Sequence, residues 1–247
     1  MSETVWIKGS HLHFENEAYT GNLSARLMHA DGKPYHTFRT ASVRVEGENI
    51  SFVNCTFENT AGLGEDVGQA IALYLDGTNI SLEKCVLKGH QDTLFLAPVP
   101  EQEFEKDGFL GANVRDMSVD YVYYFKECVI YGGVDFVFGG GTAYFEKCTF
   151  ISNEPGYVFA PSTPADVKKG FVVSDCDFIC EEGIEDHSCY LARPWRENGM
   201  VEIINCRIGS HINPIGYDDW GKDHEKIRFY ESGSEDTDLR ADFVHIV

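Results

Sequence analysis

Six of the eight cysteines lie in segments that resemble one another. Each segment reads apolar, variable, polar, Cys, variable, apolar, and the cysteines recur at intervals of 20 to 43 residues. Recurrence on this scale is typical of a solenoid or a propeller. The segments are "ISFVNCTFEN" (Cys55), "ISLEKCVLKG" (Cys85), "VYYFKECVIYG" (Cys128), "AYFEKCTFIS" (Cys148), "FVVSDCDFIC" (Cys176) and "VEIINCRIGS" (Cys206).

Short apolar runs with this recurrence, and without helical periodicity between them, predict an all-β parallel β-helix in which each coil stacks on the last. The content of 17 Phe and 12 Tyr supports strands, because aromatic side chains fit a pleated surface. Equivalent positions then lie above one another, so the cysteines are expected to form an internal column of reduced, buried thiols. We prefer this to disulfides or a metal site, since the sequence has no C-x-x-C pair.

The chain is predicted to be one domain over residues 1–247. Residues 97–120 ("APVPEQEFEKDGFLGANVRD" from Ala97 on) are polar, acidic and aperiodic, which predicts a large loop inserted in one coil. A C-terminal tail is expected from about residue 223.

The formal net charge of −20 argues against binding to nucleic acid or to an anionic membrane surface, because both require clustered Lys and Arg. We expect a monomer. The first ten residues, "MSETVWIKGS", lack the pattern of a signal peptide, and reduced cysteines slightly favour the cytoplasm. A secreted protein whose leader was removed fits the sequence as well.

One carboxylate, Asp135, interrupts the apolar run "YGGVDFVFGG". Burying an ionised Asp without partners costs several kcal/mol, so this residue has strong partners or a chemical task. Arg193 in "YLARPWRE" is a candidate partner, because a guanidinium favours the charged carboxylate and grips it in a fork. Taken alone, a structural Asp held by backbone groups or by an Arg is an equally good interpretation of Asp135.

Three further polar residues follow or precede apolar runs: Gln69 in "VGQAIALYL", and Gln91 and Asp92 in "KGHQDTLFL". A solenoid can bring them to one face with Asp135. Two Asp residues in different settings can then serve as an ionised nucleophile and a protonated general acid, and Gln amides can donate to an oxyanion. Without such convergence, Gln91 and Asp92 are ordinary turn residues.

At these residues the sequence resembles the pectin methylesterases of carbohydrate esterase family 8. Six motifs occur in the family's order between residues 37 and about 222, and six in order are a strong signal although each alone is weak. They are "TFRTASVRV" (37–45), "GQAIAL" (68–73), "HQDTLF" (90–95), "GGVDFVFG" (132–139), "LARPW" (191–195) and "INPIGYDDW" (212–220).

The resemblance implies a right-handed parallel β-helix that hydrolyses methyl esters of galacturonate in pectin or in methylated oligogalacturonides, without metal or cofactor. Asp135 is then the nucleophile, and Gln69 and Gln91 stabilise the oxyanion. Asp92 protonates the departing methanol and later activates water, and Arg193 orients Asp135.

The resemblance also implies a sugar-stacking role for Trp195, with Phe95 and Phe159 as weaker candidates. The sequence departs from the family pattern at Ala192, where Gly is usual, at Phe95, where Tyr is common, and in two larger features. The loop at 97–120 is longer than in typical plant members, and the family's early Gly-x-Tyr-x-Glu turn is absent. The chain is therefore expected to begin about one coil late, with an open strand edge.

Two other functions fit the same residues. One is an esterase or thioesterase on another acyl group, with Asp135 and Asp92 in a reshaped pocket. The other is a non-catalytic, glycan-binding β-helix. The high negative charge favours a neutral substrate, heavily methylated or short, because a demethylated polyanion would be repelled.

Overall fold

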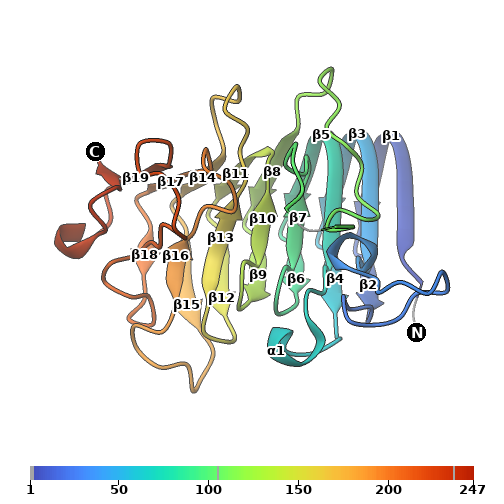
Figure 1. The fold of residues 1–247 in the computed structure, drawn as a ribbon, viewed down its shortest axis with the longest axis horizontal. Coiled ribbons are helices and arrows are strands. Elements are labelled where there is room, and N and C mark those ends of the chain that lie inside the picture. The colour runs from blue at the N-terminus through green and yellow to red at the C-terminus, as the bar shows by residue number, and fades with distance from the viewer. Residues whose placement is uncertain (1–2, 105, 236) are drawn as a thin grey trace.

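The computed structural model describes residues 3–104, 106–235 and 237–247. The chain winds into a parallel β-helix whose coils follow one another from the N-terminus to the C-terminus, as the colour progression in Figure 1 shows. One sheet has 13 strands and the other has seven. All the pairings between named strands of the described residues are parallel, as the sequence predicted.

The smaller sheet contains one short strand from each of seven successive coils. In spatial order it consists of β18 (Arg207–Ile208), β15 (Asp177–Cys180), β12 (Thr149–Ser152), β9 (Val129–Gly132), β6 (Val86–Lys88), β4 (Thr56–Asn59) and β2 (Ala18–Gly21).

The larger sheet begins with three long strands and then divides in two. The long strands are β1 (Val5–Glu15), β3 (Val43–Val53) and β5 (Leu73–Glu83). The first half of β5 pairs with one branch, formed by β7 (Leu94–Leu96), β10 (Val137–Gly139), β13 (Tyr157–Pro161) and β16 (Tyr190–Ala192). The second half pairs with the other branch, formed by β8 (Val122–Lys126), β11 (Thr142–Glu146), β14 (Phe171–Ser174), β17 (Met200–Ile204), β19 (Arg228–Ser232) and β20 (His245–Ile246).

A column of glycines allows the three long strands to bend where the two branches separate. Gly9, Gly47 and Gly77 pair with one another in register and have φ values of 144°, 149° and 150°. A Cβ on Gly47 would lie 1.8 Å from the carbonyl oxygen of Gly9. Only glycine fits this combination of positive φ and close backbone approach.

The six recurring cysteines form the predicted internal column. All are buried and free, and neighbouring members touch: the backbone N–H of Cys55 donates to Sγ of Cys85 and that of Cys148 to Sγ of Cys176. The residue before each of the six has a φ between 51° and 54°, which makes the sharp corner between the two sheets. Aromatic rings stack in the same way, with Phe125 and Phe145 at 4.6 Å. The sequence repeat therefore marks two features of each coil: the left-handed corner residue and the buried cysteine that follows it.

Short helices and irregular segments complete the coils. They include η1 (Thr37–Arg39), α1 (Gly64–Val67) and η2 (Thr237–Leu239). No strand or helix is assigned to the described part of residues 97–121, which connect β7 to β8; residue 105 lies outside the described residues. None of the helices in the described ranges is long and apolar enough to cross a membrane.

The C-terminal end of the coil differs from the sequence-based expectation. Beyond residue 223, where a tail was expected, β19 continues the sheet by pairing with β17 from Met200↔Arg228 to Ile204↔Ser232. At the other end, β1 pairs with β3 alone among the described strands, and Trp6 beside this edge is 52% exposed.

Candidate active site

Segments from several coils meet at one pocket of about 240 Å³. All five residues expected to be catalytic line it, together with Trp195. The spatial convergence on which the sequence-based hypothesis depended is therefore present. The lining consists of Thr37, Phe38, Gln69, Gln91, Asp92, Gly108, Phe109, Asp135, Phe138, Ala160, Arg193, Trp195 and Trp220.

The register of two adjacent strands brings Asp92 and Asp135 together. Leu94 of β7 pairs with Val137 of β10, so the two Asp residues, each two positions before its paired residue, occupy equivalent sites on neighbouring coils. The backbone N–H of Asp92 donates to the carbonyl of Val134 at 3.0 Å. Equivalent sites on adjacent parallel strands are about 4.8 Å apart.

Both Asp residues have left-handed backbone conformations and are almost fully buried. The φ values are 64° for Asp92 and 50° for Asp135, and the residues are 7% and 8% exposed. Non-glycine residues in this region cost energy and concentrate at functional sites. The shared conformation gives the two residues equivalent turns immediately before their strands.

Arg193 holds the carboxylate of Asp135 with two hydrogen bonds. Its Nε donates to Oδ1 at 2.8 Å and its Nη2 to Oδ2 at 2.7 Å. The guanidinium carbon also lies 4.0 Å from the centre of the Tyr157 ring and 3.9 Å from that of Trp220. Two aromatic contacts and a two-point ion pair fix both the position and the orientation of the guanidinium.

The two carboxyl groups differ in their surroundings. Burial, followed by the nearby charge of Asp135, raises the pKa of Asp92 well above its ordinary range. Burial also raises the pKa of Asp135, but the hydrogen bonds and the charge of Arg193 oppose this shift. When the pair holds a single proton, that proton belongs on Asp92, while Asp135 stays ionised against Arg193.

The two glutamines line the same pocket and remain partly exposed. The side chain of Gln91 packs against Gly64, the first residue of α1, where an added Cβ would lie 2.6 Å from Oε1. The carbonyl of Gln91 accepts a hydrogen bond from Ala70, directly after Gln69, at 3.1 Å. The backbone therefore ties the two amide-bearing residues to each other.

Phe95 and Phe159 do not line the pocket, and both are 0% exposed. Phe159 pairs with Val137 in the row that faces the interior, and its ring packs against Phe150 at 5.0 Å. Phe95 pairs with Phe138 in the outer row, but the Phe38 ring covers it at 4.9 Å. The expected sugar-stacking role is therefore wrong for these two residues, because a covered ring offers no face to a ligand.

Four aromatic residues that the sequence analysis did not assign to the site line the pocket, namely Phe38, Phe109, Phe138 and Trp220. Trp220 is 41% exposed and lies over Arg193. Its position at the end of the motif "INPIGYDDW" could have indicated from the sequence that it belongs to the site. Phe109 comes from the long loop and contacts Phe38 and Trp195. No periodicity marked it, since the loop has none.

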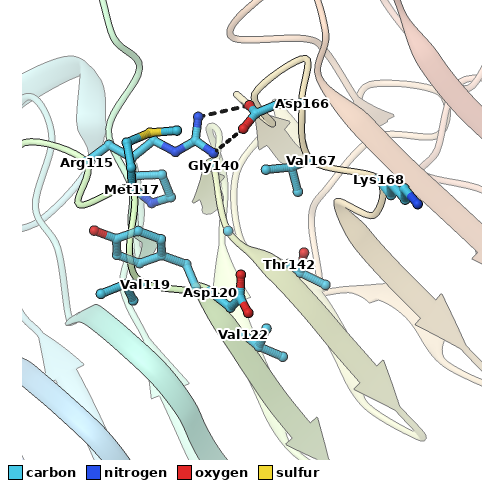
Figure 2. Close-up of a pocket in the computed structure, with 13 residues that line it drawn as sticks. Arg115, Met117, Val119, Asp120, Val122, Gly140, Thr142, Asp166, Val167 and Lys168 are labelled. Carbon is cyan, nitrogen blue, oxygen red and sulfur yellow. Dashed lines mark hydrogen bonds and ion pairs between the residues drawn. The ribbon is translucent and has the colours of Figure 1, made fainter.

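A larger pocket, of about 410 Å³, lies under the second half of the long loop and contains none of the expected site residues. Figure 2 shows Arg115 reaching across it to Asp166, with two hydrogen bonds of 2.9 and 2.8 Å. Met117 and Val119 line the same space. The ion pair anchors the loop to the neighbouring coil, which is a structural role.

The chain is similar to known pectinesterases. The family model for pectinesterases matches residues 15–112 and 118–237. Pectinesterase QRT1 of Arabidopsis thaliana is 31% identical over 216 residues, which cover 83% of this chain and 50% of that protein. Probable pectinesterase 30 of the same plant is 29% identical over 209 residues, covering 81% and 36%. The chain thus spans about a third to a half of the length of such relatives.

Solved structures share the fold. Pectin methylesterase PemA from Erwinia chrysanthemi superposes with a TM-score of 0.78 at 22% identity, covering 99% of this chain and 80% of that one. The enzyme from carrot gives 0.75 at 21% identity, covering 99% and 78%. The architecture is the right-handed parallel β-helix that the sequence predicted. From the extent of the family match and the likeness to its curated members, this chain belongs to the pectinesterase family.

Proposed function

We propose that the protein is a pectin methylesterase that hydrolyses the methyl esters of galacturonate units in pectin or oligogalacturonides and releases methanol. The observation that carries the proposal is the two-point pairing of Arg193 with Asp135 beside Asp92, whose pKa burial and the charge of Asp135 raise well above its ordinary range. Membership in the pectinesterase family supports the substrate class. A solved pectin methylesterase of the same fold is described in complex with a hexasaccharide.

In the first half of the reaction, an ionised oxygen of Asp135 attacks the ester carbonyl and forms a tetrahedral oxyanion. The side-chain amides of Gln69 and Gln91 donate hydrogen bonds to this oxyanion. Collapse of the intermediate breaks the bond to the methoxy group, and Asp92 gives its proton to the leaving oxygen, so that methanol departs. The galacturonate is left as an anhydride on Asp135.

In the second half, Asp92 is ionised and takes a proton from a water molecule as the water attacks the anhydride carbonyl. The second tetrahedral intermediate collapses and releases galacturonic acid, which loses its proton to the solvent and becomes the carboxylate. Asp135 regains its charge, and Asp92 holds its proton again. Arg193 keeps Asp135 oriented and stabilises its charged form at the start and the end of the cycle.

Electrostatics of the pocket favour a neutral ester over a carboxylate. Among the described lining residues, the cation Arg193 is already paired with Asp135, so its charge is balanced before a substrate carboxylate arrives. The protein as a whole has a formal net charge of −20. A heavily methylated or short substrate therefore meets less repulsion than a demethylated polymer.

The decisive experiment measures methanol release from highly methylated pectin by the wild-type protein and by Asp135→Asn. We expect release by the wild type and a loss of about 10³-fold or more in the variant, because an amide is not a competent nucleophile. Acetate release from an acetylated glycan without methanol release would show an esterase for another acyl group. Glycan binding with no turnover by the wild type would show a binding protein.

A further inference from the structure

The segment around Phe109 is held in place on both sides. Two residues before it, Asp107 pairs with Lys33 at 3.2 Å. Two residues after it, the carbonyl of Gly111 accepts a hydrogen bond from the buried guanidinium of Arg44. These two anchors come from elements far away in the sequence, and they fix where the loop passes over the coil.

The rest of the loop is anchored in the same manner. Arg196 donates from Nη2 to the carbonyl of Gln102 at 3.2 Å. Further along, Arg115 holds Asp166 on the neighbouring coil (Figure 2). Anchors distributed along the loop make it a fixed wall of the site, since each one ties the loop to the coil.

Phe109 faces the pocket of the catalytic residues. It lines that pocket together with Gly108, and its ring meets two other lining rings edge to face. The distances between ring centres are 5.7 Å to Phe38, with an interplanar angle of 82°, and 5.9 Å to Trp195, with an angle of 76°. Phe109 is only half-buried, so part of its surface is open to a ligand.

The lining of the pocket falls into two chemical groups. The charged and amide groups carry out the proposed reaction. The aromatic side chains, to which Phe109 belongs, have no hydrogen-bonding role in the chemistry. A methyl-esterified galacturonate unit has matching parts: a reactive ester carbonyl, and an apolar C–H face and methyl group that gain from contact with aromatic rings.

We propose that Phe109 is a specificity-determining, substrate-binding residue that packs against the apolar surface of a methyl-esterified galacturonate unit. The inference rests on the proposed function and deepens it, because it assigns recognition of the neutral ester to the long loop. An apolar ring provides no hydrogen-bonding or ionic partner for a free carboxylate. The loop thus favours methylated units over demethylated ones.

The test compares Phe109→Ala with Phe104→Ala on a short, fully methyl-esterified oligogalacturonide. Phe104 is the matched control because it lies on the same loop, is 73% exposed, and contacts Arg196 outside the pocket. We expect Phe109→Ala to raise KM about fivefold, the size of one aromatic contact, with kcat within about twofold. Phe104→Ala is expected to change neither constant, and Phe109→Tyr to restore KM.

A shift of the loop would affect these variants differently from the loss of an aromatic contact with the substrate. Phe109→Leu keeps bulk in the loop but removes the aromatic face, so a raised KM at unchanged melting temperature supports the contact, and a wild-type KM overturns it. An unchanged KM in Phe109→Ala, an equal rise in Phe104→Ala, or a fall in kcat at constant KM each overturns the proposal. The last result would assign Phe109 to support of the catalytic groups.

A binding measurement tests the role of Phe109 independently of the proposed function. Calorimetry measures the Kd of the same oligomer for Asp135→Asn with and without Phe109→Ala, which needs no turnover. If the wild type releases no methanol, the proposed function fails, yet a roughly fivefold weaker Kd with Phe109→Ala still supports the contact. An equal Kd, or no measurable binding to Asp135→Asn, overturns the role of Phe109.

Discussion

Arg193 donates two hydrogen bonds to the carboxylate of Asp135, although the two residues are 58 positions apart in sequence. Asp92 occupies the equivalent position on the adjacent coil and has a strongly raised pKa. One guanidinium thus distinguishes two carboxyl groups that the repeat places in otherwise equivalent sites. Both the proposed chemistry and the first two predictions depend on this asymmetry.

Replacing Arg193 by Lys is expected to lower kcat/KM about 10- to 100-fold, because an ammonium cannot make two parallel hydrogen bonds to a carboxylate. Arg193 lowers the pKa of Asp135 against the effect of burial. A weaker partner lets that pKa rise, so the ionised nucleophile appears only at higher pH. The acid limb of the pH–rate profile should therefore move upward.

The matched control for this substitution is Arg207→Lys. Arg207 forms a similar two-point pair with Asp177, but on the exposed surface of a neighbouring coil. We expect the control to leave the pH–rate profile unchanged. A profile that is the same for Arg193→Lys and the wild type would show that Arg193 does not set the ionisation of the nucleophile.

Asp92→Asn should abolish turnover yet stabilise the fold at neutral and alkaline pH. Burial raises the pKa of Asp92, so the native state binds more protons than the unfolded chain at pH values above the unfolded pKa of about 3.9. Stability therefore falls as pH rises through the window between the unfolded and the folded pKa. Asn has no proton to lose and avoids this cost.

The measurement is the melting temperature of both proteins at pH 4 and pH 8. We expect the gain from Asp92→Asn to be small at pH 4 and larger at pH 8, by about 2–4 °C for each kcal/mol of relieved cost. Exposed Asp120, replaced by Asn, serves as the control and should shift neither value. A gain that is independent of pH would contradict the linkage to Asp92 ionisation.

Gly64→Ala is expected to reduce kcat about 10-fold or more while leaving the fold intact. The new Cβ would lie 2.6 Å from Oε1 of Gln91 and would displace the amide that we propose as a donor to the oxyanion. Asp66→Ala, on the exposed side of the same helix, is the control for any effect on α1 itself. Steady-state kinetics would refute the assignment if the two variants had the same kcat.

Cys148→Ser should lower the free energy of unfolding by about 1–3 kcal/mol, because it buries a hydroxyl in the column of apolar thiols. Cys148 is 1% exposed and contacts Cys176 in that column. Cys180→Ser is the control, since this thiol is partly exposed and lies outside the column. Urea denaturation measures both, and equal losses would argue against a special cost of polarity inside the coil.

Much of the fold was predictable because the cysteine repeat is a local pattern. Side chains in a solenoid recur once per coil, so the spacing of Cys55, Cys85 and Cys128 already indicated stacked strands and a buried column. The motifs also located the expected catalytic residues on the sequence, and the structure brings all five to one pocket. Burial of Asp135 followed from its apolar neighbours.

The aromatic half of the site was less predictable. Phe95 lies in the outer row of its sheet, as a ligand-contacting residue would, but Phe38 from a distant segment covers it. Phe109 belongs to a loop with no periodicity, and its place at the pocket depends on long-range anchors such as Asp107 to Lys33 and Gly111 to Arg44. The exposure of an aromatic ring depends on which distant residues pack against it, and the residues adjacent in sequence do not show this.

By itself, then, the sequence determined the coil, its inward-facing thiols and the identity of the charged groups, because each follows from a pattern repeated along the chain or from motifs within it. The tertiary structure alone decided that Asp92 and Asp135 occupy equivalent positions on adjacent coils, that Phe95 and Phe159 are covered, and that Phe109 and Trp220 border the pocket. These outcomes depend on the register between coils and on long-range packing, and both are fixed only when distant segments meet.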